Sequence, residues 1–543
     1  MRKTAFLIAF LVSGFWSFAQ EDAWVYFKDK PNAQFYLTNP LEMLSQRSID
    51  RRTAQGIALD AQDVPVHQAY IDQITSQLNI QVMAKSKWLN ALHIRGSQSA
   101  INSLLSFSFV ENVDFADNAL DGRPTRPKVT CTKKKAEKTA KTASVQANFS
   151  YGVSGNQIRM LNGHLLHEQD FTGSGKIIAV LDAGFPGVNT AQPFERLRNN
   201  NQILGGYNFV DRNEDFYSRG SHGTLVLSTM GGYRENQLVG TAPDAAYYLF
   251  ITEDVGSENP VEESYWVEAA ETADSLGVDV INTSLGYFGY DNPNYSYTYA
   301  DIDGNTSFIS RAANIAFTRG MVVVVSAGNS GASDNPNIGT PADAVNVLSI
   351  GAVDANEGYV AFSSVGPTAD DRVKPDVVAQ GFQAVVSNVA GDITTASGTS
   401  FSGPIIAGMV ASLWQALPWA TNAQIVEFIK QSSDQAEFPD FNRGYGVPDF
   451  QLALSIAQLS VEDKSKSEFS LYPNPFSDVV SISSPINLSV AEITVYSSLG
   501  QVVFSRKNIV GQTSIDLDNL RTGLYFYKIM ADGHIQSGKI MKK

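Results

Sequence analysis

Residues 177–184 read Ile177-Ile178-Ala179-Val180-Leu181-Asp182-Ala183-Gly184, which is five apolar residues followed by a carboxylate and two small residues. A short, uninterrupted apolar run predicts a strand that is buried on both faces, as in the centre of a parallel sheet. Ligands of open parallel sheets bind beyond the carboxyl ends of the strands. This stretch therefore indicates both the fold and the place where chemistry is to be expected.

Similar apolar runs continue along the chain and alternate with helical patterns. The expected strands cover residues 246–251, 278–285, 321–326 and 347–352, and the expected helices include residues 260–276 and 307–319. Strands that alternate with helices predict a parallel sheet covered by helices on both faces. We therefore expect an α/β, three-layer main domain over residues 149–460.

Two smaller domains are expected on either side of this main domain. Residues 20–120 show helical patterns over 41–55, 66–78 and 100–105 and strand patterns over 24–27, 81–94 and 109–115, which predict a small α+β sandwich. Residues 468–543 show only short strands, over 479–482, 492–496, 502–504, 514–517 and 523–529, separated by turn signals such as Asp532-Gly533. A small β-sandwich is expected there.

Residues 121–148 differ in character from the rest of the chain. They contain eight Lys and Arg residues and two acidic residues, so their formal charge is 8 minus 2, or +6. Such a block predicts a basic linker open to proteolysis, either a plain solvated connector or a processing junction. The linker holds Cys131, the single cysteine of the chain, which excludes an intrachain disulfide and lies in a poor frame for a nucleophile.

The first 19 residues have the layout of a secretory signal peptide. Arg2 and Lys3 precede an apolar run over residues 5–12, and the small-residue site Ser17-Phe18-Ala19 follows. We expect the mature chain to begin at Gln20 and the protein to leave the cytoplasm. No later stretch reaches the roughly 18 apolar residues that a membrane-spanning helix needs.

The composition bounds the class of protein. With 543 residues, 43% hydrophobic and 17% charged, the chain is ordinary globular protein of three or four domains. Its net charge of -15 repels nucleic-acid phosphates, so a nucleic-acid partner is not expected.

Four polar residues stand at ends of expected elements, each among small residues. Asp182 ends the first strand, His222 opens a helix in Ser221-His222-Gly223-Thr224, and Asn329 follows a strand in Ala327-Gly328-Asn329. Ser400, in Gly398-Thr399-Ser400, precedes an almost wholly apolar helix in which Pro404 fits if it lies in the first turn. Each residue alone could be a cap or turn residue. Together they supply the nucleophile, base, orienting carboxylate and oxyanion donor of serine hydrolysis.

Over roughly residues 170–455 the chain resembles the subtilisin-like serine proteases. The order Asp, His, Ser is the one that distinguishes this family from other serine hydrolases. The matching motifs are Val180-Leu181-Asp182-Ala183-Gly184, His222-Gly223-Thr224, Gly240-Thr241-Ala242-Pro243, Ala327-Gly328-Asn329, Phe362-Ser363-Ser364, Lys374-Pro375-Asp376-Val377 and Gly398-Thr399-Ser400. The resemblance implies that Asp182, His222 and Ser400 form the triad and that Asn329 is the side-chain oxyanion donor, together with the backbone N–H of Ser400.

The chain departs from the family pattern beside these motifs. Phe401-Ser402 stands where the family usually has Met-Ala, Val226-Leu227-Ser228 displaces the usual Val-Ala-Gly, and Gln380 stands where proline is common. These changes concern substrate fit and leave the expected chemistry intact.

The resemblance also implies how a substrate is held. Ser284-Leu285-Gly286 would be an extended edge that pairs with the substrate backbone, although a plain loop after a core strand is the alternative. Asp301, Asp303 and Asn305 suggest half of a calcium loop, but Ala312 stands where that loop needs Glu, so a polar turn is expected and no metal site is assigned. The reaction requires no cofactor, and the sequence leaves structural calcium open.

Both ends acquire roles under the same resemblance. The front domain resembles an inhibitory propeptide that assists folding and acts on its own chain, with a sticky free β-domain as the alternative. The tail, which carries Tyr472-Pro473-Asn474-Pro475 and Gly523-Leu524-Tyr525-Phe526, looks like the sorting domain of the type IX secretion route, with an adhesive β-module as the alternative. That route would bring the protein to the outside or the surface of a double-membraned bacterium.

The expected activity is that of a secreted serine endopeptidase made as a zymogen, acting on proteins or peptides. One alternative is a non-catalytic surface binding or adhesion protein with the same fold. Another is an esterase or peptide ligase that uses the same nucleophile.

Overall fold

The computed structural model describes residues 20–121, 149–465, 469–483, 491–497, 501–509, 513–531 and 534–543. The predicted signal peptide, almost all of the predicted linker with Cys131, and the Asp532-Gly533 turn lie outside the described residues. The chain divides into two compact units, Met1–Leu454 and Ser455–Lys543.

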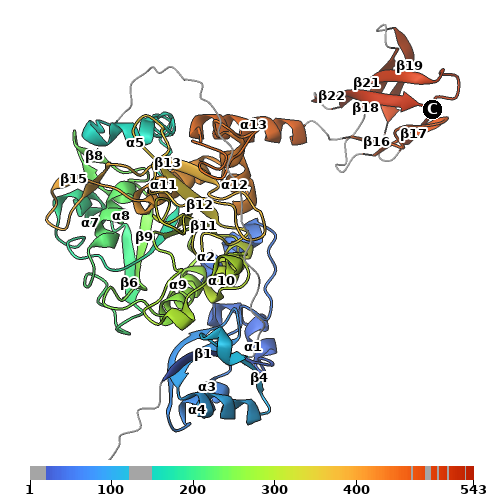
Figure 1. Ribbon diagram of the computed structural model, residues 1–543. Helices are drawn as coiled ribbons and strands as arrows, with labels where there is room; N and C mark the ends of the chain where they lie inside the picture. Colours follow the sequence, from blue (N-terminus) through green and yellow to red (C-terminus); the bar gives the residue numbers. More distant parts are fainter. Residues whose placement is uncertain are drawn as a thin grey trace, which may run out of the picture. The chain divides into compact units, whose positions relative to one another are not determined.

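The first unit is built on a parallel sheet of seven strands (Figure 1). Every neighbouring pair of strands is parallel. The order across the sheet is β13 (Val377–Gln380), β12 (Leu348–Val353), β11 (Val322–Ser326), β10 (Val280–Thr283), β5 (Ile177–Asp182), β9 (Ala246–Ile251) and β6 (Ile203–Asn208). All six residues of β5 are buried, as the apolar run predicts. The predicted α/β class is confirmed.

Helices cover both faces of this sheet. Helices α9 (Val261–Leu276) and α10 (Phe308–Thr318) share a core with Ala179 and Leu181 of β5. Helices α8 (His222–Gly231) and α11 (Thr399–Ala416) pack against each other, and α11 also packs against β10 to β13. The remaining helices of the main domain are α5 (Gly155–Arg159), α6 (His164–His167), α7 (Glu195–Asn199), α12 (Asn422–Gln431) and α13 (Phe450–Ser465). None of the helices in the described part of the chain is long and apolar enough to cross a bilayer.

Several boundaries differ from the expectation. The strand expected over 278–285 ends at Thr283, so Ser284-Leu285-Gly286 lie just beyond the sheet. β6 was not anticipated, because Gly205-Gly206 interrupt its apolar pattern. Two short hairpins, β7 (Tyr233–Arg234) with β8 (Leu238–Val239) and β14 (Ala384–Ser387) with β15 (Ile393–Ala396), lie outside the main sheet.

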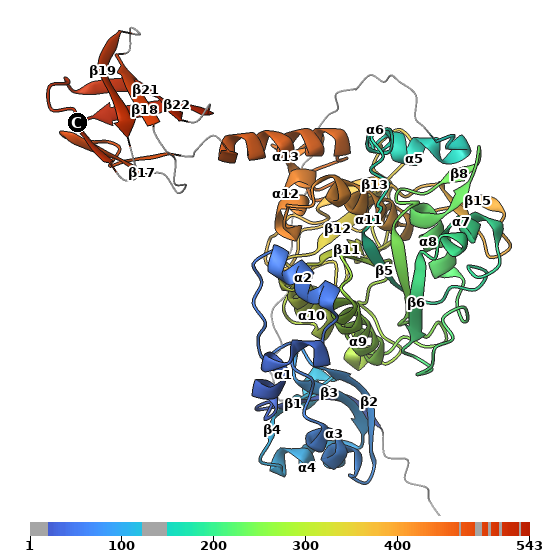
Figure 2. The ribbon, with the colours of Figure 1, turned by 180° about the vertical axis from the view of Figure 1, so that it is seen from behind.

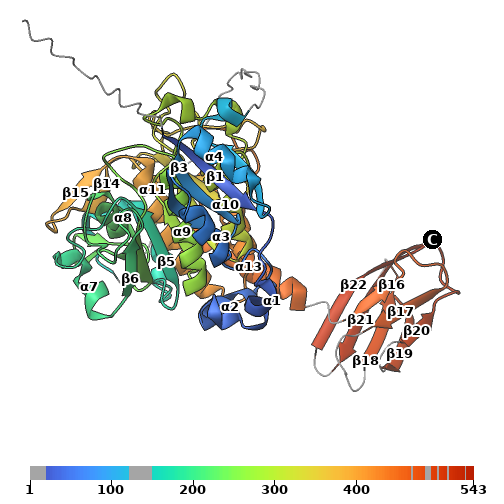
Figure 3. The same ribbon diagram turned by 90° about the horizontal axis from the view of Figure 1, so that it is seen from below.

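The front domain is an antiparallel sheet with helices packed on it, so the predicted α+β sandwich is confirmed. Its strands, in the order β2 (Ile80–Ser86), β3 (Ala91–Gly96), β1 (Glu21–Phe27) and β4 (Val110–Phe115), pack on α3 (Gln68–Thr75) and α4 (Gln98–Ser103). The sheet lies against α9 and α10 of the main domain (Figure 3). There the Trp24 ring stacks on Phe308 with centroids 5.1 Å apart, and Trp24 Nε1 donates to Ser264 Oγ.

The start predicted for the helix over residues 41–55 is wrong. Helix α2 runs only from Gln46–Ala54, because the Ser45 hydroxyl caps it by accepting from the backbone N–H of Ser48. Before it come a 3-10 turn at Pro40–Glu42 and helix α1 (Ala33–Thr38). Because α1 buries no residue, it has no apolar periodicity from which the helix could be predicted.

The second unit contains two antiparallel sheets that share one core, so the predicted β-sandwich is confirmed. One sheet holds β16 (Ser470–Tyr472), β17 (Val479–Ser483) and β20 (Thr513–Asp516), and the other holds β19 (Val502–Ile509), β18 (Ala491–Tyr496), β21 (Gly523–Ala531) and β22 (His534–Lys542). Buried Val480, Ile515, Ile493 and Ile529 come from both sheets. β16 and β22 were not expected from the sequence.

Candidate active site

Asp182 and His222 are brought together at the carboxyl end of the sheet. Asp182 is the last residue of β5, and His222 is the first residue of α8. The Nδ1 atom of His222 lies 2.8 Å from Oδ1 of Asp182, which also accepts the Ala183 N–H at 2.7 Å. Asp182 is fully buried, whereas 39% of the His222 side chain is exposed. The bond through Nδ1 leaves Nε2 as the ring atom that can take a proton from a nucleophile.

The charge of Asp182 governs the His222 imidazole. The nearby carboxylate, helped by its hydrogen bond, raises the pKa of His222 above the ordinary histidine value against the opposing effect of burial. Such an imidazole is a stronger base than free histidine.

A glycine allows the close approach of these two elements. A Cβ atom on Gly223 would lie 2.6 Å from the Gly184 carbonyl oxygen and 2.9 Å from Cβ of Asp182. A larger residue after His222 would therefore push the start of α8 away from the end of β5.

Ser400 is the second residue of α11, which begins after Gly398. The expectation that Pro404 lies in the first turn is wrong, because Pro404 is the sixth residue of the helix. A proline there cannot donate to the carbonyl of Ser400, four residues earlier. The Ser400 carbonyl instead accepts from the hydroxyl of Ser284 at 3.0 Å. The helix thus tolerates Pro404 because a side chain from the neighbouring loop replaces the missing donor.

Ser284 and Ser400 are joined a second time. The Ser400 hydroxyl donates to the Ser284 carbonyl at 3.3 Å. In this structure the Ser400 hydroxyl therefore has a backbone carbonyl as its hydrogen-bond partner. Catalytic hydrogen bonds of unliganded enzymes are often long or misaligned and tighten when substrate binds. The ring of Phe401, the residue after Ser400, lies 5.9 Å from the His222 ring, centroid to centroid.

Asn329 reaches the same place from the end of β11. Gly328 has φ of +105°, and a Cβ there would lie 2.9 Å from Ser364 Oγ, so the turn that presents Asn329 requires glycine. Oδ1 of Asn329 accepts the N–H of Thr399 at 2.9 Å and its hydroxyl at 3.1 Å. With Oδ1 engaged, the Nδ2 amino group is the part of the side chain that can donate to a bound oxyanion.

A cavity of about 180 Å³ adjoins Ser400. Its lining includes the three residues expected to bind substrate, Ser284-Leu285-Gly286, together with Asn329, and it contains no charged side chain. Next to them Tyr287 and Thr340 exchange backbone hydrogen bonds at 2.8 and 3.0 Å, which fixes the loop after β10. Of the four residues expected to be catalytic, Ser400 and Asn329 line this cavity, whereas Asp182 and His222 lie outside its lining.

Glu253 belongs to the same edge and was missed by the sequence reasoning. It follows β9, whose neighbour β5 ends in Asp182, and the Thr252 N–H donates to the Asp182 carbonyl at 3.0 Å. The hydroxyl of Tyr287 donates to Glu253 Oε1. Burial raises the pKa of Glu253 to about 8, and the negative charge of Asp182 adds to the effect. The end of the expected strand 246–251 was the available signal.

The polar turn expected at residues 301–305 is seen in the structure. Asp303 Oδ1 accepts the N–H groups of Asn305 and Thr306, and Asp301 Oδ2 accepts the N–H of Thr298. Within the described ranges, no group of three or more His, Cys, Asp or Glu side chains is placed to hold a metal ion.

Gln380, which replaces a common proline, has defined partners. Its Oε1 accepts from Asn156 Nδ2 at 2.9 Å, and its Nε2 donates to the carbonyls of Phe382 and Gln383. The side chain thereby ties α5 to the loop between β13 and β14.

Comparison with known families places the main domain. The family model described as "Subtilase family" matches residues 173–447, about half of the chain. The chain belongs to the subtilase family. The model described as "Peptidase S8 propeptide domain, Bacteroidota" matches residues 22–138, and the one described as "Secretion system C-terminal sorting domain" matches residues 470–543. The predicted propeptide and sorting domain are confirmed, and the sorting domain indicates a secreted or cell-surface subtilase.

Individual subtilases resemble the chain at moderate identity. Subtilisin NAT of Bacillus subtilis subsp. natto is 30% identical over 287 residues, which are 52% of this chain, and the chain spans 65% of the length of that relative. M-protease of Shouchella clausii (strain KSM-K16) is 28% identical over 328 residues, 60% of this chain and 74% of the relative. Among solved structures, that of MycP1 with the N-terminal propeptide removed covers 55% of this chain and 96% of its own, with 25% identity and a TM-score of 0.45.

Proposed function

We propose that this subtilase is a secreted serine endopeptidase made as a zymogen. The observation that carries the proposal is the 2.8 Å bond between His222 and Asp182 at the edge where Ser400 and Asn329 border one cavity. Relatives that are named as proteases, M-protease of Shouchella clausii and an alkaline protease of Alkalihalobacillus alcalophilus, support the same activity. The propeptide and sorting domain support a route in which the chain is exported before it is processed, through the type IX machinery of a double-membraned bacterium.

The residues would divide the work as follows. Ser400 attacks the scissile carbonyl after its hydroxyl turns from Ser284 to Nε2 of His222, which accepts the proton and then gives it to the leaving amine. Asp182 holds the Nδ1–H tautomer and stabilises the imidazolium. Asn329 Nδ2 and the Ser400 N–H donate to the oxyanion.

The substrate would lie extended along Ser284-Leu285-Gly286, with one side chain in the uncharged cavity. Such a site requires no cofactor, and the partners are protein or peptide substrates and the chain's own propeptide.

Peptide hydrolysis by the secreted protein tests this proposal. Ser400→Ala and His222→Ala should lose nearly all activity, and Asn329→Ala should lose roughly 100- to 1000-fold in kcat, about 3 kcal/mol of transition-state stabilisation. A variant outside the site, Arg198→Gln, serves as the control. Rates near wild type in the Ser400 or His222 variant would overturn the assignment.

The bond from the Ser400 hydroxyl to the Ser284 carbonyl is also compatible with the alternative function, a non-catalytic binding protein with the same fold. A fluorophosphonate that labels Ser400 in the mature protein would exclude it. Comparison of ester and amide turnover, with transfer to added amines, separates an endopeptidase from an esterase or ligase.

A further inference from the structure

Helix α2 of the propeptide lies at the edge of the sheet opposite the candidate active site. Asp279, just before β10, accepts the N–H of Ile177 at the start of β5, and the same oxygen accepts from Arg47 at 2.6 Å. Arg47 also donates to the Gly277 carbonyl. Asp182 is the sixth and last residue of β5, so α2 and the triad are separated by the strand length, roughly 16–17 Å. Figure 2 shows α2 in front of the main domain, near α10.

Two arginines of α2 converge on a single carboxylate of α9. Arg51 Nη2 lies 2.5 Å from Oδ1 of Asp274, and Arg52 Nη2 lies 2.6 Å from Oδ2. Arg52 also pairs with Asp63 of the propeptide at 2.8 Å. No more than 4% of any of these side chains is exposed. The pairs that Asp274 makes with Arg51 and Arg52 exist only while propeptide and catalytic domain are together, whereas the Arg52–Asp63 pair lies within the propeptide.

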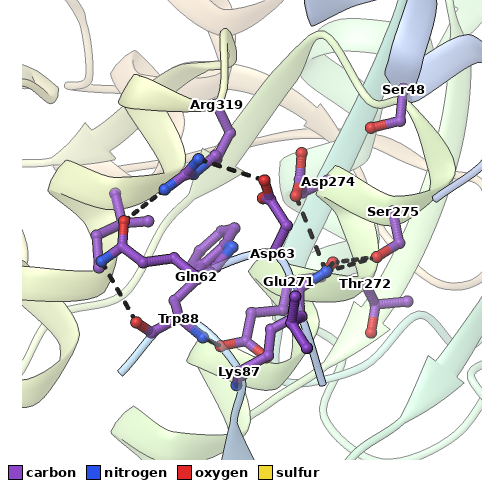
Figure 4. Close-up of polar contacts among 12 residues, drawn as sticks. Ser48, Gln62, Asp63, Lys87, Trp88, Glu271, Thr272, Asp274, Ser275 and Arg319 are labelled. Carbon is purple, nitrogen blue, oxygen red and sulfur yellow. Dashed lines mark hydrogen bonds and ion pairs between the residues drawn. The ribbon is translucent and has the colours of Figure 1, made fainter. Parts of the chain in front are cut away.

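The chain that follows α2 extends the contact along the ends of two further helices. Gln55 donates to the Gly320 carbonyl at 2.8 Å and accepts the Asn422 N–H at 2.9 Å. Arg319, at the end of α10, pairs with Asp60 at 3.1 Å and contacts Gln62 and Asp63 (Figure 4).

The sandwich of the propeptide makes a second contact with α9, which adjoins that of α2. The carboxylate of Glu271 accepts from the Ser86 hydroxyl at 2.7 Å and from the N–H groups of Lys87 and Trp88 at 2.9 Å. Figure 4 shows Glu271 and Asp274 on the same stretch of helix, with Lys87 of the sandwich in contact with both: its N–H donates to Glu271 and its Nζ lies 3.9 Å from Asp274 Oδ2. The propeptide is thus attached at two places, through its sheet and through α2 with residues 55–63.

We propose that α2 and residues 55–63 are a retention anchor, which keeps the propeptide on the catalytic domain after the linker is cut. This proposal rests on the proposed function in one respect, which is that a zymogen is cut in the linker. Two linked contacts hold far better than one, because each keeps the other at high effective concentration. A peptide substrate competes at the far edge of the sheet and cannot reach this anchor. The surfaces that the anchor buries are polar, and water can solvate them after separation. The propeptide can therefore still dissociate.

Binding in an inactive chain tests the anchor without any readout of hydrolysis. A recognition sequence for a site-specific protease is placed within residues 128–141 of the full-length Ser400→Ala chain, which is then cut there. Retention of the propeptide over time is measured by size-exclusion chromatography and native mass spectrometry. Arg51→Gln/Arg52→Gln removes both close cations of the buried Asp274 and leaves only Lys87 Nζ at 3.9 Å, so the propeptide should leave at least about 100-fold faster than from the parent.

The matched control is Arg95→Gln. Arg95 lies in the same propeptide but pairs with Asp22 of β1, and this variant should release at the parental rate. If the double variant does not fold, Gln55→Ala removes two uncharged contacts and should still release several-fold faster. Parental retention in the double variant, or in Gln55→Ala if that is the variant that folds, would overturn the anchor. Absence of peptide hydrolysis by the wild-type protein would refute only the protease assignment, because the retention experiment does not depend on hydrolysis.

Discussion

His222 is the residue whose environment fixes the pH range of the proposed reaction. It must be neutral to accept the Ser400 proton, and the Asp182 charge raises its pKa above the usual value of about 6.5. Activity should be full above the raised pKa and fall as the pH drops through it. The acid limb of kcat/KM against pH should therefore lie above about 6.5. A midpoint at or below that value would contradict the assignment of His222 as the base paired with Asp182.

Ser284 is predicted to hold the nucleophile Ser400 in position. Pro404 cannot donate to the Ser400 carbonyl, and the Ser284 hydroxyl donates to it instead. Ser284→Ala removes the 3.0 Å bond to the Ser400 carbonyl. We expect a loss of about 1–3 kcal/mol in the free energy of unfolding, because a polar group loses its partner, and a lower kcat as Ser400 shifts. Ser402→Ala is the control, since the Thr399 carbonyl that Ser402 contacts keeps its bond from Ser326. Denaturant unfolding and peptide hydrolysis measure both effects; equal losses in the two variants would refute the role of Ser284.

Single residues also show the limit of reasoning from sequence at the site. Asp182, His222, Asn329 and Ser400 could be named because each stands at the end of an element among small residues. Glu253 could not, because its environment depends on Tyr287, 34 residues away. The Ser284 contact could not be predicted for the same reason, since Ser284 donates to a carbonyl that Pro404, far away in the sequence, leaves without a helical donor.

Among the elements, α6 carries a prediction about acid stability. Its His167 is buried, with Nδ1 2.8 Å from the Tyr151 hydroxyl and Nε2 3.1 Å from the Thr241 carbonyl. Burial lowers the pKa of His167 from 6.5 to about 4, so the unfolded chain takes up a proton before the folded chain does. Stability from this residue is full above pH 6.5 and falls, by up to about 3 kcal/mol, as the pH drops toward 4.

Chemical denaturation between pH 7 and 4 measures that loss. His167→Gln cannot take up the proton, so its unfolding free energy should be lower at pH 7 but change less over the same range. The same slope in both proteins would show that other groups cause the acid sensitivity.

Elements that are buried on both sides were the ones most readily predicted. β5 and β11 are apolar up to their last residue, and β12 is interrupted only by Ser349 and Gly351, because a covered parallel strand has no solvent-facing position. β6 and α1 could not be predicted, for different physical reasons. Glycines break the apolar pattern of β6, and α1 buries no residue. The start of α2 was set by the Ser45 cap, a local hydrogen bond that outweighed the wider helical pattern.

At the scale of the whole molecule, the two units should unfold independently. Each has its own buried core, and that of the tail includes Phe476, Val480, Ile493 and Ile540. A chain that ends at Ser465 should keep the melting temperature of the main unit, which differential scanning calorimetry of the full and shortened Ser400→Ala proteins measures. A drop of more than a few degrees would show that the tail stabilises the rest.

The parallel direction of all seven strands has a pharmacological consequence. Because every strand starts at one edge of the sheet and ends at the other, a small molecule bound beside Asp279 and Arg47 would lie a strand length from a peptide bound along Ser284-Leu285-Gly286. Such a compound need not mimic a peptide, and its effect would be insensitive to how much substrate is present. Its potency would instead track the lifetime of the cut precursor, which makes maturation a point of intervention distinct from turnover.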